Sequence, residues 1–234
     1  MSLSALREEV LEANLELVRR GLVLYTFGNA SGISREDSLV VIKPSGVPYE
    51  QMKPEHLVVT DLDGKIVEGK FKPSSDLPTH LILYKAFPAI GGVAHTHSEY
   101  ATSWAQSRCS IPCFGTTHAD YFYGPVPVTA VMTKEEIASD YEKNTGIAIV
   151  RAFEKTDSSA VPAVLVANHG PFAWGPDAAS AAHNAVILES VARMAYFTIA
   201  INRDAQPVGH ELHDKHYLRK HGANAYYGQP KGKK

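Results

Sequence analysis

Apolar residues recur at helical spacing near both ends of the chain. Between residues 3 and 20 they fall on one helix face, and Gly21 follows as a stop signal. A longer stretch, 176–201, is rich in alanine and begins with Pro176 and Asp177, which favour the first turn of a helix. A third, more polar stretch covers 210–222. These patterns predict a helix in each of the three segments.

Short apolar runs punctuated by Gly, Pro and Asp occupy much of the middle. They predict strands within 22–34, 38–46, 91–97 and 162–175, and a hairpin over 56–69 that turns at Asp63-Gly64. Helices are expected at about 75–87, at 98–106, and over 133–155 with an interruption at Gly146. Hairpins outnumber strand-helix-strand units. We therefore predict an α/β fold with a mainly antiparallel or mixed sheet covered by helices, in one domain over 1–228.

Composition narrows the class of protein. Lys and Arg number 23 against 25 acidic residues, which argues against a nucleic-acid partner because such binding needs a concentrated basic surface. We expect no membrane span, because no stretch of the sequence approaches the roughly 20 consecutive apolar residues that a span requires. The first residues are charged where a leader would be apolar, and only two cysteines occur, so a cytoplasmic location is expected. The basic tail 229–234 is expected to be disordered.

Two histidines one residue apart, His95 and His97, lie in the apolar run "GGVAHTHS". On a strand, residues i and i+2 face the same way, so the two imidazoles lie side by side and can chelate a metal. Taken alone, the pair slightly favours two hydrogen-bonded histidines of the protein interior over a metal site. His169, which precedes Gly170 near a second apolar run, and Asp76, at the start of a helix, change that balance. Three imidazoles and a carboxylate make a zinc-type ligand set.

Small polar residues form three loops that suit an anion. They are Gly28-Asn29, Ser45-Gly46 after Lys43, and Ser74-Ser75 at a helix start. In such loops backbone N–H groups and hydroxyls converge on a phosphate. Taken singly, each loop is more often an ordinary turn, loop or helix cap.

Several longer motifs occur in a fixed order over nearly the whole chain: "GNASG", "KPSG", "KPSSDLPTH", "HTHS", "TTHADYFYG", "NHGPFAWG" and "DKHYLRKHGANAYYGQ". With them the chain resembles the class II, zinc-dependent sugar-phosphate aldolase and epimerase family, and within it the enzymes that epimerise L-ribulose 5-phosphate. The resemblance implies one Zn²⁺ per subunit, held by Asp76, His95, His97 and His169. It also implies a phosphate and substrate cradle formed by the three loops and Lys43.

The reaction that the resemblance implies inverts C4 of a pentulose phosphate. The C4 hydrogen is not next to the carbonyl, so C3–C4 must break in a retro-aldol step and re-form on the other face of the rotated aldehyde. Zinc would act as a Lewis acid on the developing enediolate. Two acid/base groups are needed, one for each epimer. The resemblance implies Asp120 and Tyr227 for these roles, with Thr116, His216 and Arg219 as candidate substrate-binding groups.

The family also implies a homotetramer with active sites at subunit boundaries. The position of Tyr227 near the chain end predicts that Asp120 and the zinc ligands come from one subunit and Tyr227, with Arg219, from the next. Three alternatives remain: a family aldolase, a family dehydratase acting on a thio-sugar phosphate, and a non-enzymatic scaffold. Family aldolases carry Glu where this chain has Asp76. The "TTHADYFYG" and "KHYLRKHGANAYYGQ" segments disfavour the dehydratase, and a scaffold would be expected to have lost zinc ligands.

Overall fold

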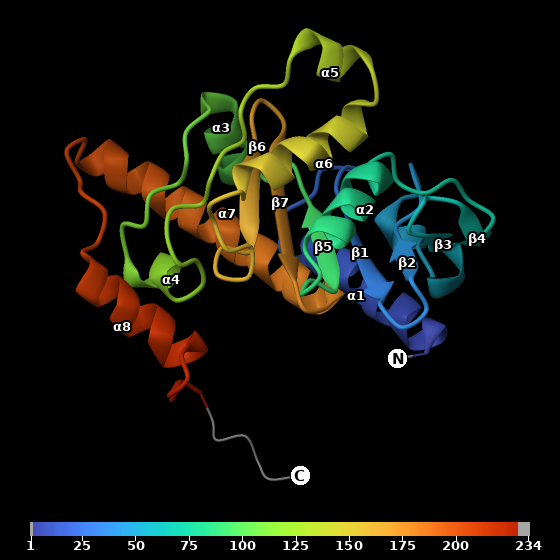
Figure 1. Cartoon of the computed structure of the whole chain (residues 1–234), viewed down its shortest axis with the longest axis horizontal. Helices are drawn as coiled ribbons and strands as arrows, with labels where there is room; N and C mark the ends of the chain where they lie inside the picture. The colour runs from blue at the N-terminus through green and yellow to red at the C-terminus, as the bar shows by residue number, and fades with distance from the viewer. Residues whose placement is uncertain (1, 229–234) are drawn as a thin grey trace.

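A seven-stranded antiparallel sheet organises the protein, whose computed structural model describes residues 2–228 (Figure 1). The strand order is β4-β3-β2-β1-β5-β7-β6. Its members are β1 (Asn29–Ser34), β2 (Leu39–Ile42), β3 (Val58–Asp61), β4 (Ile66–Glu68), β5 (Gly92–His95), β6 (Ala163–Val166) and β7 (Gly170–Gly175). Every pairing between these strands is antiparallel. This confirms the predicted fold class.

Eight α-helices lie among the described residues. They are α1 (Leu3–Arg19), α2 (Leu77–Ala86), α3 (Glu99–Ser107), α4 (Thr116–Ala119), α5 (Lys134–Ala138), α6 (Tyr141–Ala152), α7 (Ala178–Ile201) and α8 (His210–His221), with 3-10 turns at Tyr49–Gln51 and Pro54–His56. Helices α1 and α7 cover one face of the sheet and α2 and α6 the other, while α4 and α8 lie together beside it (Figure 1). The helices predicted at both ends of the chain are confirmed.

The alternation of side chains along β1 explains which helix packs on which face. Ser31 hydrogen-bonds His80 and Tyr84 of α2, at 2.7 Å in both cases. Asn29 shares the face of Ser31 and is the register partner of His95 on β5. The cross-strand pair Asn29–His95 therefore points toward the start of α2, where Asp76 lies.

On the opposite face, α1 binds the backbone of β1 directly. The Asn14 side chain is fully buried, and its amide donates to the carbonyl of Ala30 at 3.0 Å while its oxygen accepts the Ala30 N–H at 2.8 Å. The pairing with β2 begins only at Ser31, so Asn14 satisfies backbone groups that no strand reaches on that side. This contact holds β1 in place at Ala30, the residue next to Asn29.

Three predicted elements differ from the structure. Residues 22–28 form no strand, because Tyr25 and Gly28 have φ angles of 53° and 79°, which lie outside the extended region. The helix expected over 133–155 breaks at Ser139–Asp140 and continues through Gly146, whose missing side chain lets α6 approach α2; a Cβ there would lie 2.8 Å from Cβ of Ile82. Residues 163–175 form a hairpin of two strands that turns at Asn168 (φ 62°).

Helix α7 contradicts the expectation that no stretch of the chain approaches the length and composition of a membrane span. Its 24 residues are long and apolar enough to cross a membrane, judged by length and composition only. In the fold, its first half packs against β5 and β7, so there it serves as a core helix. Near its end, Met194, Tyr196, Phe197 and Ile201 remain exposed.

Candidate active site

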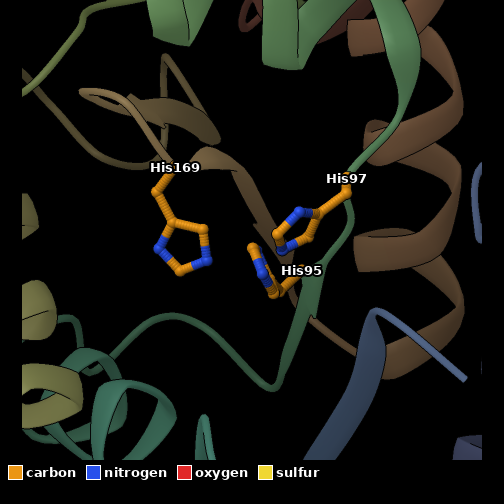
Figure 2. A group of neighbouring side chains, drawn as sticks. All are labelled: His95, His97 and His169. Carbon is orange, nitrogen blue, oxygen red and sulfur yellow. The ribbon is translucent and has the colours of Figure 1, made fainter.

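Three histidines meet at the end of the sheet where β6 turns into β7. His95 ends β5, His97 follows two residues later, and His169 lies in the β6–β7 turn. One ligand nitrogen from each lies within 4.8 Å of the others, and Figure 2 shows the three rings turned toward one another. No other group of three or more such side chains is found within residues 2–228. The sequence predicted these three residues as metal ligands.

The protonation of these rings suits a metal. Burial, together with the neighbouring imidazoles of His95 and His97, lowers the pKa of His169 to about 4. Burial likewise lowers the pKa of His97. Both rings are therefore neutral at pH 7, which is the form that binds a cation. Nδ1 of His95 lies 2.9 Å from the carbonyl oxygen of Pro171, which leaves Nε2 to face the cluster. The donor set fits a divalent transition metal.

Asp76 lines the same cavity, but its carboxylate is not part of the three-histidine group. Its Oδ2 accepts a hydrogen bond of 2.7 Å from the amide of Asn29. Burial would raise the pKa of Asp76, yet the facing His95 and His80 and the bond from Asn29 together hold this pKa below its usual value. An ionised carboxylate thus lies next to the histidines. The single side-chain oxygen of Asn29, Oδ1, is buried without a partner.

The three small-residue loops come together in this cavity, which has a volume of about 440 Å³. All seven predicted cradle residues line it: Gly28, Asn29, Lys43, Ser45, Gly46, Ser74 and Ser75. Two backbone bonds of 2.9 Å, from Ser45 N–H to the Lys72 carbonyl and from Ser74 N–H to the Lys43 carbonyl, tie two of the loops together. Loops far apart in sequence therefore form one polar wall beside the histidines.

Lys43 supplies the positive charge of that wall. Only 2% of the residue is exposed, and its Nζ donates to the carbonyl of Thr26 at 3.1 Å and lies 4.7 Å from the centre of the Tyr49 ring. Burial lowers the pKa of Lys43 to about 8, with Asp76 opposing the shift. Lys43 is therefore charged at pH 7. The partners of its Nζ, a backbone carbonyl and an aromatic ring, are neutral, so its charge would stabilise an anion in the cavity.

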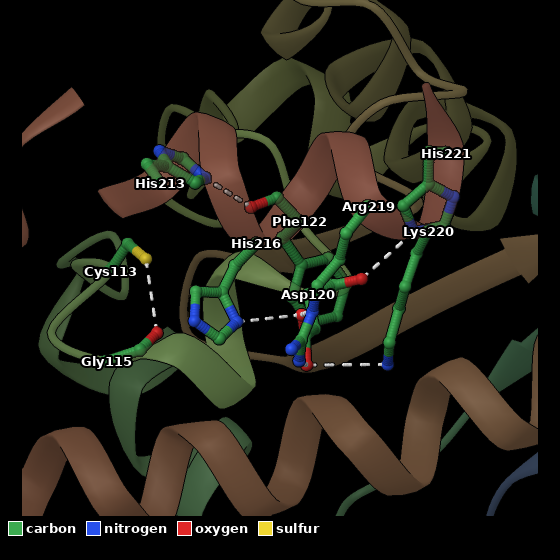
Figure 3. Close-up of polar contacts among 9 residues, drawn as sticks. All are labelled: Cys113, Gly115, Asp120, Phe122, His213, His216, Arg219, Lys220 and His221. Carbon is green, nitrogen blue, oxygen red and sulfur yellow. Dashed lines mark hydrogen bonds and ion pairs between the residues drawn. The ribbon is translucent and has the colours of Figure 1, made fainter. Parts of the chain in front are cut away.

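A second polar cluster lies where α4 meets α8 and centres on Asp120 (Figure 3). The Asp120 carboxylate accepts two hydrogen bonds from Arg219, at 2.8 and 3.1 Å. Nδ1 of His216 lies 3.1 Å from Oδ1, and Nζ of Lys220 lies 3.5 Å from Oδ2. Burial would raise the pKa of Asp120, but the bonds from Arg219 and His216 outweigh it and lower the pKa.

Tyr227 belongs to this second cluster. Its backbone N–H donates to the carbonyl of Arg219 at 3.1 Å, and its ring lies 4.8 Å from the Arg219 guanidinium carbon and 4.5 Å from Nζ of Lys220. The residue is 59% exposed. Thr116 begins α4, and its carbonyl accepts the N–H of Asp120. The five predicted residues Thr116, Asp120, His216, Arg219 and Tyr227 are thus gathered on α4, α8 and the segment that follows α8.

The two clusters are separate within one chain. None of the described residues that line the histidine cavity comes from α4, α8 or the segment after α8. The sequence predicts Asp120 and the metal ligands from one subunit and Tyr227, with Arg219, from the next. In the structure Asp120 pairs with Arg219 of its own chain, next to Tyr227. These contacts favour Asp120, Arg219 and Tyr227 acting from one subunit, and the division between subunits stays a prediction.

Two features of the sites were not foreseen. Tyr141 and Glu142, at the start of α6, line the histidine cavity, and Lys220 completes the ring of cations around Asp120. Lys220 could have been predicted from the sequence, because it directly follows Arg219. Tyr141 and Glu142 reach the cavity only through the packing of α6 on α2, which no local pattern reveals.

This fold, together with a histidine cluster and a polar cradle in one cavity, defines a class of protein. The family model for the class II aldolase and adducin N-terminal domain matches residues 8–196. The chain belongs to this family.

Relatives narrow the comparison further. The chain is 53% identical over 224 residues to proteins named L-ribulose-5-phosphate 4-epimerase UlaF from Salmonella paratyphi A and Salmonella typhi, covering 96% of this chain and 98% of each relative. Among solved structures, an L-fuculose 1-phosphate aldolase is 28% identical with a TM-score of 0.79, covering 94% of this chain and 97% of the other. YgbL from Klebsiella pneumoniae, described as a putative aldolase/epimerase/decarboxylase, is 26% identical with a TM-score of 0.73, covering 92% of this chain and 99% of the other.

Proposed function

We propose that this protein is an L-ribulose-5-phosphate 4-epimerase, which converts L-ribulose 5-phosphate to D-xylulose 5-phosphate by breaking and re-forming C3–C4. One observation carries the proposal: three histidines, an ionised carboxylate and a lysine-bearing polar cradle line one cavity of a size that suits a small sugar phosphate. The 53% identity to relatives of that name supports the particular reaction.

The cradle binds the phosphate. The hydroxyls of Ser45, Ser74 and Ser75 and the backbone N–H groups of Gly46 and Ser75 supply neutral donors, and Lys43 adds the charge that suits a dianion. Gly28 has a φ of 79°, and a Cβ there would lie 2.9 Å from the carbonyl oxygen of His95, so no other residue fits this turn without strain. Asn29 holds Asp76 through its amide and presents its free oxygen to the substrate or its water.

His95, His97 and His169 hold one divalent cation per subunit, proposed to be Zn²⁺, with Asp76 beside it as a fourth group. When bound, this cation supplies Lewis-acid stabilisation of the negative charge that builds on the ketose oxygens as C3–C4 breaks. Asp76 remains ionised at neutral pH, because the surrounding groups hold its pKa low. It therefore adds negative charge to the metal site rather than a proton.

The second cluster supplies the proton transfers at the C4 oxygen. The two epimers present that oxygen on opposite faces, so Asp120 and Tyr227 serve one face each. Asp120 is ionised and can accept a proton, and Nδ1 of His216 is hydrogen-bonded to its carboxylate. Arg219 fixes the carboxylate and underlies the Tyr227 ring, while Thr116 and His216 are proposed to contact substrate.

Assembly is required to join the two clusters. We propose a homotetrameric ring in which the Asp120 cluster of one subunit faces the histidine cavity of the next, so that Asp120 and Tyr227 come from the same chain. The exposed apolar end of α7, with Met194, Phe197 and Ile201, supports contact between copies. The exposed position of Tyr227 lets its hydroxyl reach a neighbour. The free cysteines Cys109 and Cys113 favour a cytoplasmic setting.

The family aldolase is the second candidate. The solved L-fuculose 1-phosphate aldolase shares the fold at 28% identity, against 53% for the relatives named as epimerases. The carboxylate beside the histidines is Asp76, where the resemblance leads us to expect Glu in an aldolase. The dehydratase and the scaffold remain less favoured for the reasons of motif and ligand set given above.

Turnover in heavy water with L-ribulose 5-phosphate tests the reaction. The account predicts D-xylulose 5-phosphate with no deuterium at C4, because the C4–H bond never breaks, and activity that a chelator abolishes and zinc restores without added NAD. Deuterium at C4 would rule out the retro-aldol path. Accumulating glycolaldehyde phosphate at the rate of substrate loss would favour the aldolase instead.

Lys43 gives the reaction a predicted pH dependence. Its charge is lost above pH of about 8, so kcat/KM should fall about tenfold per pH unit there, while kcat falls less because a bound dianion keeps the lysine charged. Lys43→Met should lower kcat/KM throughout and remove the alkaline fall. Rates on the two proteins from pH 6 to 10 measure this, and an unchanged alkaline fall in Lys43→Met would contradict the role.

A further inference from the structure

Tyr141 lies within the histidine cavity and touches one of its three histidines. Its hydroxyl oxygen is 3.3 Å from Nδ1 of His169, and the two ring centres are 6.1 Å apart. Burial raises the pKa of Tyr141, so its phenol keeps its proton at neutral pH. The function proposed above gives this residue no role.

Helix α6 holds Tyr141 in place. Tyr141 begins α6, and its carbonyl accepts the hydroxyl of Thr145 at 2.9 Å. The next residue of α6, Glu142, is tied to α2 because its carbonyl accepts the hydroxyl of Thr79 at 2.5 Å. His169 lies in the β6–β7 turn, directly after Asn168, whose φ is 62°. A ring on such a turn needs a partner to fix its orientation.

The hydrogen-bond partner of an imidazole decides which of its two nitrogens is free to bind a metal. A neutral imidazole offers a metal one nitrogen and carries its hydrogen on the other, which must find an acceptor. For His95 that acceptor is the carbonyl oxygen of Pro171. For His169 the group at Nδ1 is the Tyr141 hydroxyl. The two ligands are thus held alike, one by a backbone oxygen and one by a side chain.

We infer that Tyr141 is a positioning residue for the metal centre. Its oxygen accepts the Nδ1 hydrogen of His169, selects the tautomer with a free lone pair on Nε2, and turns that nitrogen toward His95 and His97. The phenol hydrogen is then left to point into the cavity, where it donates to the substrate. This inference rests on the metal site of the proposed function.

Tyr141→Phe tests the inference, because it keeps the ring and removes only the hydroxyl. Metal-free wild type, Tyr141→Phe and the exposed control Tyr196→Phe would each compete for zinc with a chromophoric chelator, and each would be unfolded in denaturant without metal. The expected result is a zinc Kd about 10-fold to 100-fold weaker in Tyr141→Phe only, with unchanged stability of the metal-free protein. The cobalt-substituted form should also show a shifted visible spectrum.

Zinc bound by Tyr141→Phe as tightly as by wild type, with an identical cobalt spectrum, would overturn the inference and leave the proposed function standing. A weaker Kd matched by an equal loss in Tyr196→Phe would overturn it too. Failure of the wild type itself to bind zinc would instead defeat the metal site on which both rest. The three outcomes are therefore distinguishable without any activity assay.

Discussion

Replacing His97 by Asn should weaken zinc binding by at least about 100-fold and lower kcat by a similar or larger factor. Loss of a partner that only orients a ligand costs about 10-fold to 100-fold, and loss of the ligand itself should cost at least as much. His97 has no substitute, because the metal-binding group among residues 2–228 contains only His95 and His169 besides it. Zinc content after dialysis and the rate with L-ribulose 5-phosphate measure the two effects.

His210→Asn is the matched control for that substitution. His210 is exposed at the start of α8 and lies outside the cavity, so its replacement should change neither zinc content nor rate. A His95→Asn, His97→Asn double variant that kept stoichiometric zinc and full rate would show that the metal site has been assigned to the wrong residues.

Asp120→Asn and Tyr227→Phe should each lower kcat by about 10²-fold to 10⁴-fold while zinc content stays that of the wild type. Each variant removes one acid/base group and leaves the histidine cavity intact. Tyr227→Phe is the cleaner of the two, since the ring remains to pack on Arg219 and Lys220. Asp120→Asn also removes the charge that Arg219 and Lys220 share and that His216 contacts, so its stability must be measured alongside.

Asp204→Asn controls for a lost surface carboxylate, because Asp204 is exposed between α7 and α8. It should retain the full rate. Variants of Asp120 and Tyr227 that kept near wild-type kcat, with zinc bound, would exclude both residues from proton transfer and would leave the acid/base groups to be sought among the cavity residues.

Much of the fold could be predicted because its patterns are local. The alternation of His95 and His97, the Asp63-Gly64 turn and the periodicity of α7 each follow from neighbours in sequence. The predictions of a strand over 22–28 and of a helix break at Gly146 were wrong, because the backbone of both segments is set by the tertiary structure. Positive φ at Tyr25 ends the apolar run as a strand, and contact with Ile82 makes glycine useful inside a helix where it is ordinarily unfavourable.

The site was predictable to the same extent. The loops around Gly28, Ser45 and Ser74 are ordinary turns, loops or caps when taken singly, and they were predicted because they match the motifs of the family in order. The histidines were predicted from their alternation on a strand together with the same resemblance. The pairing of Asp120 with Arg219 spans 99 residues, and that of Tyr141 with His169 spans 28, so neither leaves a mark on the local sequence. Only the packed helices α4, α8 and α6 bring these side chains together.

The central claim is that one subunit supplies the histidines and the next supplies Asp120 with Tyr227. Co-expression of differently tagged His97→Asn and Asp120→Asn subunits, followed by isolation of mixed rings, tests it most directly. Random mixing should restore about a quarter of the sites of a ring, since an intact cavity then meets an intact Asp120 cluster. Mixed Asp120→Asn and Tyr227→Phe rings should gain nothing, because every cluster is damaged. Rescue in the second mixture, or its absence in the first, would contradict the account.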